Sequence, residues 1–210
     1  MNIDKSQNLL KNKPNKNKVY VNPSSKVLSI LKKHELWVIK DKINGKKGNL
    51  KEFFSFNNTK FLGFKMEKIN LNGLKFNNCL FDTCSLEKAL FNETEFYNCK
   101  FINSNLNESK INNAIFQNCS FNNVKLNDLY FDECRKIENI VFENKSELSN
   151  CYFPNNLIKN IIFDDVDLSY IDFSEGIFEN VKIINNSILE ETNFITVSYT
   201  HLRAHETDSY

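Results

Sequence analysis

The chain has 210 residues and a mass of 24.6 kDa, a length that suits one domain with small appendages. The formal net charge is +1, but residues 1–53 hold 13 Lys against four acidic residues, whereas residues 54–194 hold 13 Lys and Arg against 20 Asp and Glu. Nineteen Phe with five Gly and three Pro disfavour a mixed α/β enzyme, whose turns draw on Gly and Pro. No apolar run approaches the roughly 18 residues of a membrane span, and Met1 to Lys18 lacks the apolar stretch of a signal peptide. We therefore expect a cytoplasmic protein without a membrane span.

Residues 1–22 are rich in Lys and Asn and contain few large apolar groups. This composition predicts a flexible basic tail. Two interpretations stay open at this point: the tail contacts nucleic acid or an anionic membrane, or it is a solvated segment without a ligand.

Residues 23–50 predict an N-terminal capping helix followed by a turn. Pro23, Ser24 and Ser25 are typical of a helix start. An apolar stripe at helical spacing follows, made of Val27, Ile30, Leu31, His34, Trp37 and Val38. An open solenoid end exposes unpaired backbone and apolar side chains, so a cap is needed there. We interpret His34 and Trp37 as packing residues of the cap.

Residues 51–131 contain a strict five-residue period. Every fifth residue from Phe56 to Phe131 is large and apolar, which fits neither the 3.6-residue period of a helix nor the 2.0-residue period of a strand. The chain must therefore turn every five residues. Two positions earlier, smaller residues recur over most of the run: Thr59, Cys79, Cys84, Ala89, Thr94, Cys99, Ser104, Ser109, Ala114 and Cys119.

A second period of twenty residues separates the large positions into four columns. One column is Phe56, Phe76, Phe96 and Phe116, and the next is Phe61, Phe81, Phe101 and Phe121; the third is aliphatic, with Met66, Leu86, Leu106 and Leu126, and the fourth is mixed, with Leu71, Phe91, Ile111 and Phe131. Four faces per coil follow, with like side chains stacked about 4.8 Å apart. The recurrent Asn58, Asn78, Asn98 and Asn118 are expected at corners, where Asn tolerates left-handed backbone.

The units Cys-Leu-Phe-Asp-Thr (79–83), Ser-Asn-Leu-Asn-Glu (104–108) and Cys-Ser-Phe-Asn-Asn (119–123) resemble those of the pentapeptide-repeat family. The resemblance implies an all-β solenoid: a right-handed quadrilateral parallel β-helix of about six to seven 20-residue coils. This chain departs from the family pattern in two ways: it has Phe in place of many of the Leu, and it has Lys or Leu at positions where the family prefers Asp or Asn.

The period breaks after Phe131, because Lys136 falls in a predicted inward position, and it resumes out of phase at Leu148. We expect an interrupting loop or a distorted coil over 132–147 and a second repeat block over 148–196. In that block the predicted inward residues run from Leu148 through Phe153, Ile158, Phe163, Leu168, Phe173, Phe178 and Ile183 to Ile188.

All six cysteines, at 79, 84, 99, 119, 134 and 151, lie two positions before a large slot. We interpret them as small buried core fillers. A zinc site would need His or short Cys-x-x-Cys spacing, and stacked cysteines with parallel Cβ vectors form poor disulfides. No metal or cofactor is expected.

Residues 197–210 abandon both the period and the composition, and resemble a translated sequencing-adapter read. We expect a non-native tail and exclude it from the fold prediction. His201 and His205 have the i, i+4 spacing of helical metal ligands, but we do not interpret them as a site.

A filled rod has no concavity for catalysis, so we expect no enzyme and no catalytic residues. The leading hypothesis is a bacterial scaffold or protein-interaction module with an unidentified partner, and a homodimer is left open. The rod itself is not expected to bind nucleic acid. The alternative, implied by the family resemblance, is an acidic DNA mimic that binds DNA gyrase and protects it from quinolones, although the basic N-terminal segment argues against it. The candidate interaction patch is acidic: Asp164, Asp165, Asp167, Asp172, Glu175 and Glu179.

Overall fold

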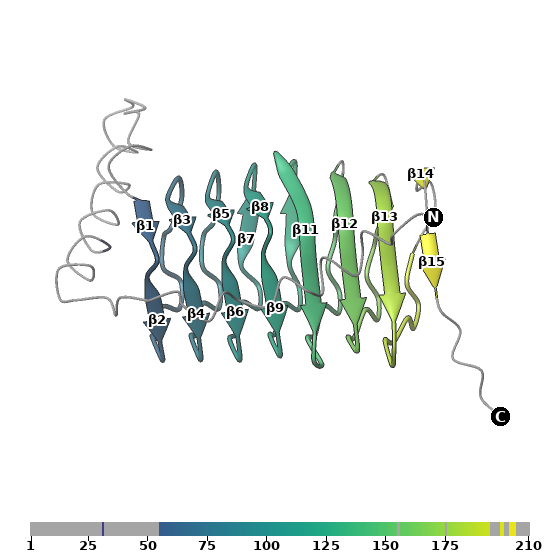
Figure 1. Cartoon of the computed structure of the whole chain (residues 1–210), viewed down its shortest axis with the longest axis horizontal. Coiled ribbons are helices and arrows are strands. Elements are labelled where there is room, and N and C mark those ends of the chain that lie inside the picture. Colours follow the sequence, from purple (N-terminus) through teal and green to yellow (C-terminus); the bar gives the residue numbers. More distant parts are fainter. Residues whose placement is uncertain are drawn as a thin grey trace, which may run out of the picture.

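The computed structural model describes residue 31 and residues 55–154, 156–174, 176–193, 198–199 and 202–204. These residues form a parallel β-solenoid, in which each coil lies beside the next along one axis (Figure 1). The predicted solenoid is therefore confirmed. We number its coils 1 to 7 by the inward residue that begins each: Phe56, Phe76, Phe96, Phe116, Ile137, Ile158 and Phe178.

Each coil has four faces because the backbone turns through a left-handed residue at every fifth position. In coil 1 these residues are Asn58, Gly63, Lys68 and Gly73, with φ between 51° and 72°. We name the faces 1 to 4 after the inward residues of coil 2, which are Phe76, Phe81, Leu86 and Phe91. The prediction that Asn recurs at corners is confirmed: Asn58, Asn78, Asn98 and Asn118 all have φ between 51° and 56°.

Most strands lie on faces 1 and 2. In coils 1–4 they are short: β1 (Ser55–Asn57), β3 (Lys75–Asn77), β5 (Glu95–Tyr97) and β8 (Ile115–Gln117) on face 1, and β2 (Lys60–Leu62), β4 (Leu80–Asp82), β6 (Lys100–Ile102) and β9 (Ser120–Asn122) on face 2. In coils 5–7 one strand covers both faces: β11 (Lys136–Glu143), β12 (Leu157–Asp164) and β13 (Ile177–Ile184). Face 4 carries β7 (Lys110–Asn112) and β10 (Tyr130–Asp132). Face 3 is held by isolated bridges such as Lys65 to Ser85.

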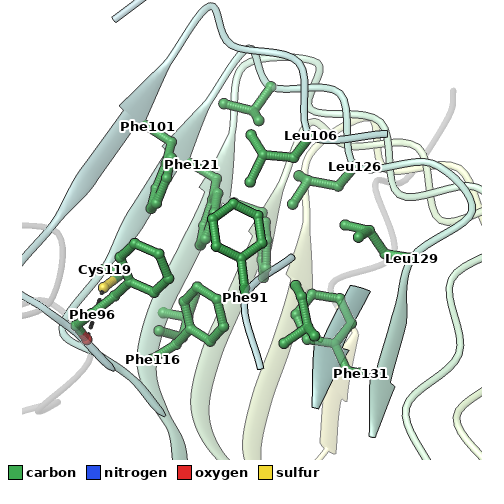
Figure 2. Close-up of a cluster of buried hydrophobic side chains, with 14 of the residues drawn as sticks. Phe91, Phe96, Phe101, Leu106, Phe116, Cys119, Phe121, Leu126, Leu129 and Phe131 are labelled. Carbon is green, nitrogen blue, oxygen red and sulfur yellow. Dashed lines mark hydrogen bonds between the residues drawn. The ribbon is translucent and has the colours of Figure 1, made fainter. Parts of the chain in front are cut away.

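Stacked aromatic rings fill the interior. Phe76 and Phe96 stack with ring centroids 5.1 Å apart, and Phe81 and Phe101 with centroids 4.8 Å apart, so each column repeats at the strand spacing. Figure 2 shows these columns side by side, with the leucines of face 3 closing the core. Each buried Phe contributes roughly 1.5–3 kcal/mol of hydrophobic stabilisation.

The smaller inward residues join successive coils through hydrogen bonds. Thr94 Oγ1 donates to the Leu71 carbonyl at 2.9 Å, and Ser109 Oγ donates to the Leu86 carbonyl at 2.9 Å. The cysteine thiols occupy the same slot, and Cys84 Sγ lies 3.3 Å from the Phe61 carbonyl. These side chains thereby satisfy buried carbonyls of the inward residues in the preceding coil.

The stretch 132–147 is not a protruding loop. Its strand β11 pairs with β8 and β9 on one side and with β12 on the other, so it is a complete coil with a modified period. Extra residues are absorbed before Ile137 and at the corner formed by Asn144 and Lys145. The predicted break of the period at Lys136 is confirmed: one added residue places Ile137 inward at 5% exposure, and Lys136 Nζ lies 2.7 Å from Glu138.

Near the C-terminal end the structure differs from the sequence analysis in two places. Ile188 is not inward but exposed, because another extra residue places it in register with Asp167, which precedes the inward Leu168. The excluded segment 197–210 contains β14 (Ser198–Tyr199) and β15 (Leu202–Ala204), and both pair with β13. Its foreign origin stays a prediction.

Little of the predicted capping helix at 23–50 can be compared with the structure. Leu31 alone is described, and it has helical backbone and belongs to the core cluster. The basic tail at 1–22 lies outside the described residues.

Candidate interaction surface

The six acidic residues predicted as one patch do not share a face. Because five residues turn the chain by one face, the five that are described surround the axis: Asp164 and Asp165 at the end of face 2, Asp167 on face 3, Asp172 on face 4 and Glu179 on face 1. Glu175 lies outside the described residues. Glu179 is also neutralised locally, since its Oε2 lies 2.8 Å from Lys159 Nζ.

Asp167 has a structural role in its corner. Its Oδ1 accepts hydrogen bonds from the Ser169 backbone N–H at 2.9 Å and from the Ser169 hydroxyl at 2.6 Å. Burial raises the pKa of this carboxyl, but hydrogen bonds from Ser169 and Ser149 together hold the pKa below its ordinary value. Asp167 is therefore an ionised residue whose carboxylate stabilises the turn by accepting hydrogen bonds from Ser169.

Face 1 carries an exposed apolar pair at the start of the long strands. Leu157 in β12 and Ile177 in β13 are neighbours in register and are 44% and 48% exposed. The ion pair between Lys159 and Glu179 lies two residues further along the same strands. Protein-binding surfaces combine an apolar centre with a polar rim, and this pair with its neighbouring ion pair has that arrangement on a small scale.

Face 4, the neighbour of face 1, adds two tyrosines. Tyr130 and Tyr152 are paired across coils 4 and 5, with ring centroids 5.0 Å apart, and Tyr130 is 48% exposed. Exposed tyrosine supplies large contact area with a polar end and is enriched at interfaces. The corner between faces 4 and 1 is thus flanked by aromatic and aliphatic groups.

An asparagine ladder runs along the corner between faces 1 and 2. The amide of each Asn donates to the Asn one coil earlier: Asn118 to Asn98 at 3.1 Å, Asn139 to Asn118 at 2.8 Å, Asn160 to Asn139 at 2.9 Å and Asn180 to Asn160 at 2.7 Å. These side chains satisfy one another, so the row is a structural seam. The twenty-residue recurrence of Asn was the sequence signal for it, although only up to Asn118.

Arg135 was not identified from the sequence. From the corner between faces 4 and 1 it donates to the carbonyls of Asn113 at 2.9 Å and Glu93 at 3.3 Å, and to Glu95 Oε1 at 3.2 Å. It therefore links the ends of coils 2, 3 and 4 where the period changes. The only available signal was that Arg is rare in this Lys-rich chain.

The cysteines line the interior as predicted. In the described residues all six are unpaired thiols, and five of them are buried. A hydrogen bond to Cys99 and burial raise the pKa of Cys79 well above its ordinary range, and burial raises the pKa of Cys151 to about 12. Within the same residues no group of three or more His, Cys, Asp or Glu could hold a metal ion. In this part of the chain, too, no helix reaches the length and apolarity of a membrane span.

The charge of the rod differs along its axis. Residues 55–114 carry seven Lys and six acidic residues, whereas residues 115–193 carry six Lys and Arg and fourteen Asp and Glu. The formal net charge is thus +1 for coils 1–3 and −8 for coils 4–7.

These features define a class of protein: a repeat solenoid with a filled interior, whose surfaces are its four outer faces. The family model "Pentapeptide repeats (9 copies)" matches residues 91–135, where coils 3 and 4 keep the period without interruption. The matched stretch therefore consists of pentapeptide repeats, the family whose units the sequence resembles.

Three solved structures illustrate the likeness. QnrB1, described as a plasmid-mediated fluoroquinolone resistance protein, is 19% identical with a TM-score of 0.40, over 73% of this chain and 84% of that one. The pentapeptide-repeat protein Rfr23 from the cyanobacterium Cyanothece 51142 is 13% identical with a TM-score of 0.35, over 61% and 90%. HetL from Nostoc sp. strain PCC 7120, involved in heterocyst differentiation regulation, is 11% identical with a TM-score of 0.26, over 79% and 90%. A search of curated proteins found no match.

Proposed function

We propose that this protein is a non-enzymatic scaffold that binds a protein partner through the outer surface of face 1 in coils 5–7. The observation that supports it is the exposed pair Leu157 and Ile177, side by side in register on two eight-residue strands. Because the strands are hydrogen-bonded to both neighbouring coils, the surface loses little conformational entropy when a partner binds.

The chemistry of the outer faces supports a binding role over catalysis. Glu179 and Asp167, two of the carboxylates that could act as acids or bases, are engaged in an ion pair and in a turn. The reduced thiols of the interior agree with a cytoplasmic location, where disulfides are rare.

The test is a binding comparison with matched variants. A partner is first captured by crosslinking from a lysate of the source cells and purified. We expect its Kd for the double variant Leu157→Glu, Ile177→Glu to rise at least about tenfold, because burying two carboxylates at an apolar centre is costly. The control is Leu62→Glu, since Leu62 is 51% exposed on face 2 of coil 1. Equal affinity for both variants would exclude face 1 as the surface.

A second candidate is an acidic rod that takes the place of duplex DNA on DNA gyrase. The formal charge of −8 on residues 115–193, distributed over all four faces, favours it. We expect such binding to weaken steeply with salt. Gyrase supercoiling assays with and without a fluoroquinolone, comparing the parent with a variant in which Asp164, Asp165 and Asp172 are changed to Asn, test it. Protection by both proteins, or by neither, would contradict the idea.

A further inference from the structure

Three cysteines form an unbroken column inside the solenoid. Cys79, Cys99 and Cys119 occupy the same inward slot on face 2 of coils 2, 3 and 4, and their exposures are 0%, 0% and 2%. Successive coils are hydrogen-bonded at this slot: the Lys100 backbone N–H donates to the Cys79 carbonyl at 2.9 Å. One coil later, the Ser120 backbone N–H donates to the Cys99 carbonyl at 3.1 Å. The core therefore contains three reduced thiols in one line.

The three thiols have the same orientation. Each donates to the carbonyl of the face 1 Phe in the preceding coil: Cys79 to Phe56 at 3.3 Å, Cys99 to Phe76 at 3.4 Å and Cys119 to Phe96 at 3.6 Å. Figure 2 shows the last of these contacts. Side chains with the same contacts in successive coils differ only by one coil step, so neighbouring sulfurs lie about 4.8 Å apart along the axis.

The spacing determines which bond can join two of these thiols. A disulfide needs its sulfurs about 2.0 Å apart, so parallel side chains one coil apart cannot form one without movement of the backbone. An ion midway between them would lie about 2.4 Å from each sulfur, close to the distance of about 2.3 Å for a zinc–thiolate bond. The two metal–sulfur bonds would then point in opposite directions along the axis, which is linear coordination.

Ligand number and charge identify the ion. Zinc takes four ligands in structural sites, but in the described part of the chain no group of three or more His, Cys, Asp or Glu could hold a metal ion. A soft cation that is satisfied by two thiolates is therefore required. A monovalent ion such as Cu(I) would leave a net negative charge in an apolar core, which is costly, whereas a divalent ion gives a neutral unit. Mercury(II) is soft and divalent, and it binds two thiolates in a line.

We propose that Cys99, together with either Cys79 or Cys119, binds one Hg²⁺ ion as a linear bis-thiolate inside the solenoid. The two thiols release their protons to solvent, two S–H bonds are replaced by two S–Hg bonds, and no electron is transferred. The weak S–H···O hydrogen bonds of both thiols are lost, which is a small cost beside two metal–thiolate bonds. Because Cys99 belongs to both pairs, the column holds a single ion. This assignment does not depend on the proposed function.

The first test measures how many mercury ions the full-length protein retains. The protein is loaded with one equivalent of mercuric chloride, once by incubation of the folded chain and once by refolding from urea, because an ion reaches a buried slot only when the coils open. Excess glutathione then removes mercury from single thiols, and native mass spectrometry counts the ions that remain. We expect one mercury in place of two protons on each chain. A chain that retains no mercury after either loading would overturn the proposal.

Alanine variants locate the ion. Cys99→Ala breaks both pairs, and we expect mercury retention to fall at least about tenfold, because no second thiol is then held beside the first. Cys79→Ala and Cys119→Ala each leave one pair, so each should retain one ion. The matched control is Cys84→Ala, since Cys84 is also buried but has Ser104 in the same slot of the next coil, and its N–H donates to Ser104 Oγ at 3.0 Å. Full retention by Cys99→Ala, or loss in Cys84→Ala, would refute the assignment.

Further measurements separate binding from folding. Alanine already fills this type of slot at Ala89 and Ala114, which are both 0% exposed, so the variants should keep the circular dichroism spectrum of the parent. The double variant Cys79→Ala, Cys119→Ala leaves Cys99 without a second thiol and should lose mercury as Cys99→Ala does; retention there would contradict the proposal. X-ray absorption at the mercury edge of the loaded parent should show two sulfur ligands, and a larger number would exclude the linear site.

Discussion

Phe121 and Phe142 stack with ring centroids 4.8 Å apart, the same separation as Phe101 and Phe121, although the first pair is 21 residues apart in the chain and the second pair is 20. The extra residue is therefore absorbed at a corner, and the column of rings is uninterrupted. Core packing requires the inward side chains of each coil to stack on those of the coil before it, so a difference in chain length is absorbed at the corners.

The wide corner at Asn144 and Lys145 gives the first prediction. Both residues have left-handed φ angles, 55° and 62°, and a left-handed lysine costs roughly 1–2 kcal/mol. Lys145→Gly should therefore raise the free energy of unfolding by about 0.5–1 kcal/mol, measured by urea denaturation. Ser120→Gly, within β9, should lower it by a similar amount. A loss of stability in Lys145→Gly would contradict the corner assignment.

The asparagine ladder predicts a difference between two substitutions at one site. Asn139→Gly keeps the left-handed backbone at φ 58° but removes the hydrogen bonds to Asn118 and Asn160, for a cost of roughly 1–2 kcal/mol. Asn139→Ala should cost about 1–2 kcal/mol more, because Ala resists the left-handed conformation. Thermal or urea denaturation compares the free energies of unfolding of the two variants. Equal values would mean that the loss of stability comes from the hydrogen-bond ladder alone and that the left-handed backbone contributes nothing.

Asn156 is a buried polar residue that joins coils 4 and 5. At 2% exposure, its Nδ2 donates to the carbonyls of Phe131 at 2.7 Å and Pro154 at 2.8 Å, and its Oδ1 accepts from Cys134 N–H at 2.9 Å. Asn156→Ala leaves three buried backbone groups unpaired, and we expect a loss of at least about 3 kcal/mol of unfolding free energy.

The control for Asn156 is Asn122→Ala. Asn122 is half-buried on face 2 and donates to Glu143 Oε1 at 2.9 Å. We expect a loss of at most about 1 kcal/mol there, since water replaces the lost partner. A comparable loss at both sites would mean that Asn156 does not carry the junction.

A small apolar cavity lies where the column of face 1 changes from Phe to Ile. Its volume is about 20 Å³, and Ile137, Ile158, Phe116 and Phe142 contribute to its lining. Ile158→Phe should fill it and stabilise the protein by up to about 1 kcal/mol, whereas Ile158→Ala should cost about 2–5 kcal/mol. Denaturation midpoints check both, and a destabilised Ile158→Phe would show that the cavity cannot accept a ring.

The buried thiols predict a loss of stability in alkali. Burial raises the pKa of Cys151 to about 12, against an ordinary value of 9.0. The neutral thiol is thus the form that the fold favours. The stabilisation is complete below about pH 9 and decreases as the pH rises towards 12, by about 1.4 kcal/mol for each unit.

The measurement is urea denaturation at pH 8 and pH 10.5. The parent should lose more stability between the two than Cys151→Ala, which removes the titrating group. Parallel losses in the two proteins would assign the alkaline sensitivity to other groups.

The sequence alone was sufficient for the solenoid because its period is local. A large apolar residue at every fifth position and like residues at every twentieth leave one way to bury them, and the predicted inward residues from Phe56 to Phe131 are all buried. The same argument identified the core cysteines and the left-handed Asn corners. It failed at Ile188, because a single added residue shifts the register of everything that follows.

Only the tertiary structure decided where the added residues go and which surface residues meet. A corner can absorb one residue without disturbing the stacked core, so 132–147 is a coil rather than a protruding loop. Residues close in sequence, such as Asp164 and Asp172, turn away onto different faces, whereas Leu157 and Ile177, twenty apart, become neighbours. The physical reason is that hydrogen bonding between coils determines which residues are neighbours on an outer face. Because the chain turns every five residues, residues close in sequence lie on different faces.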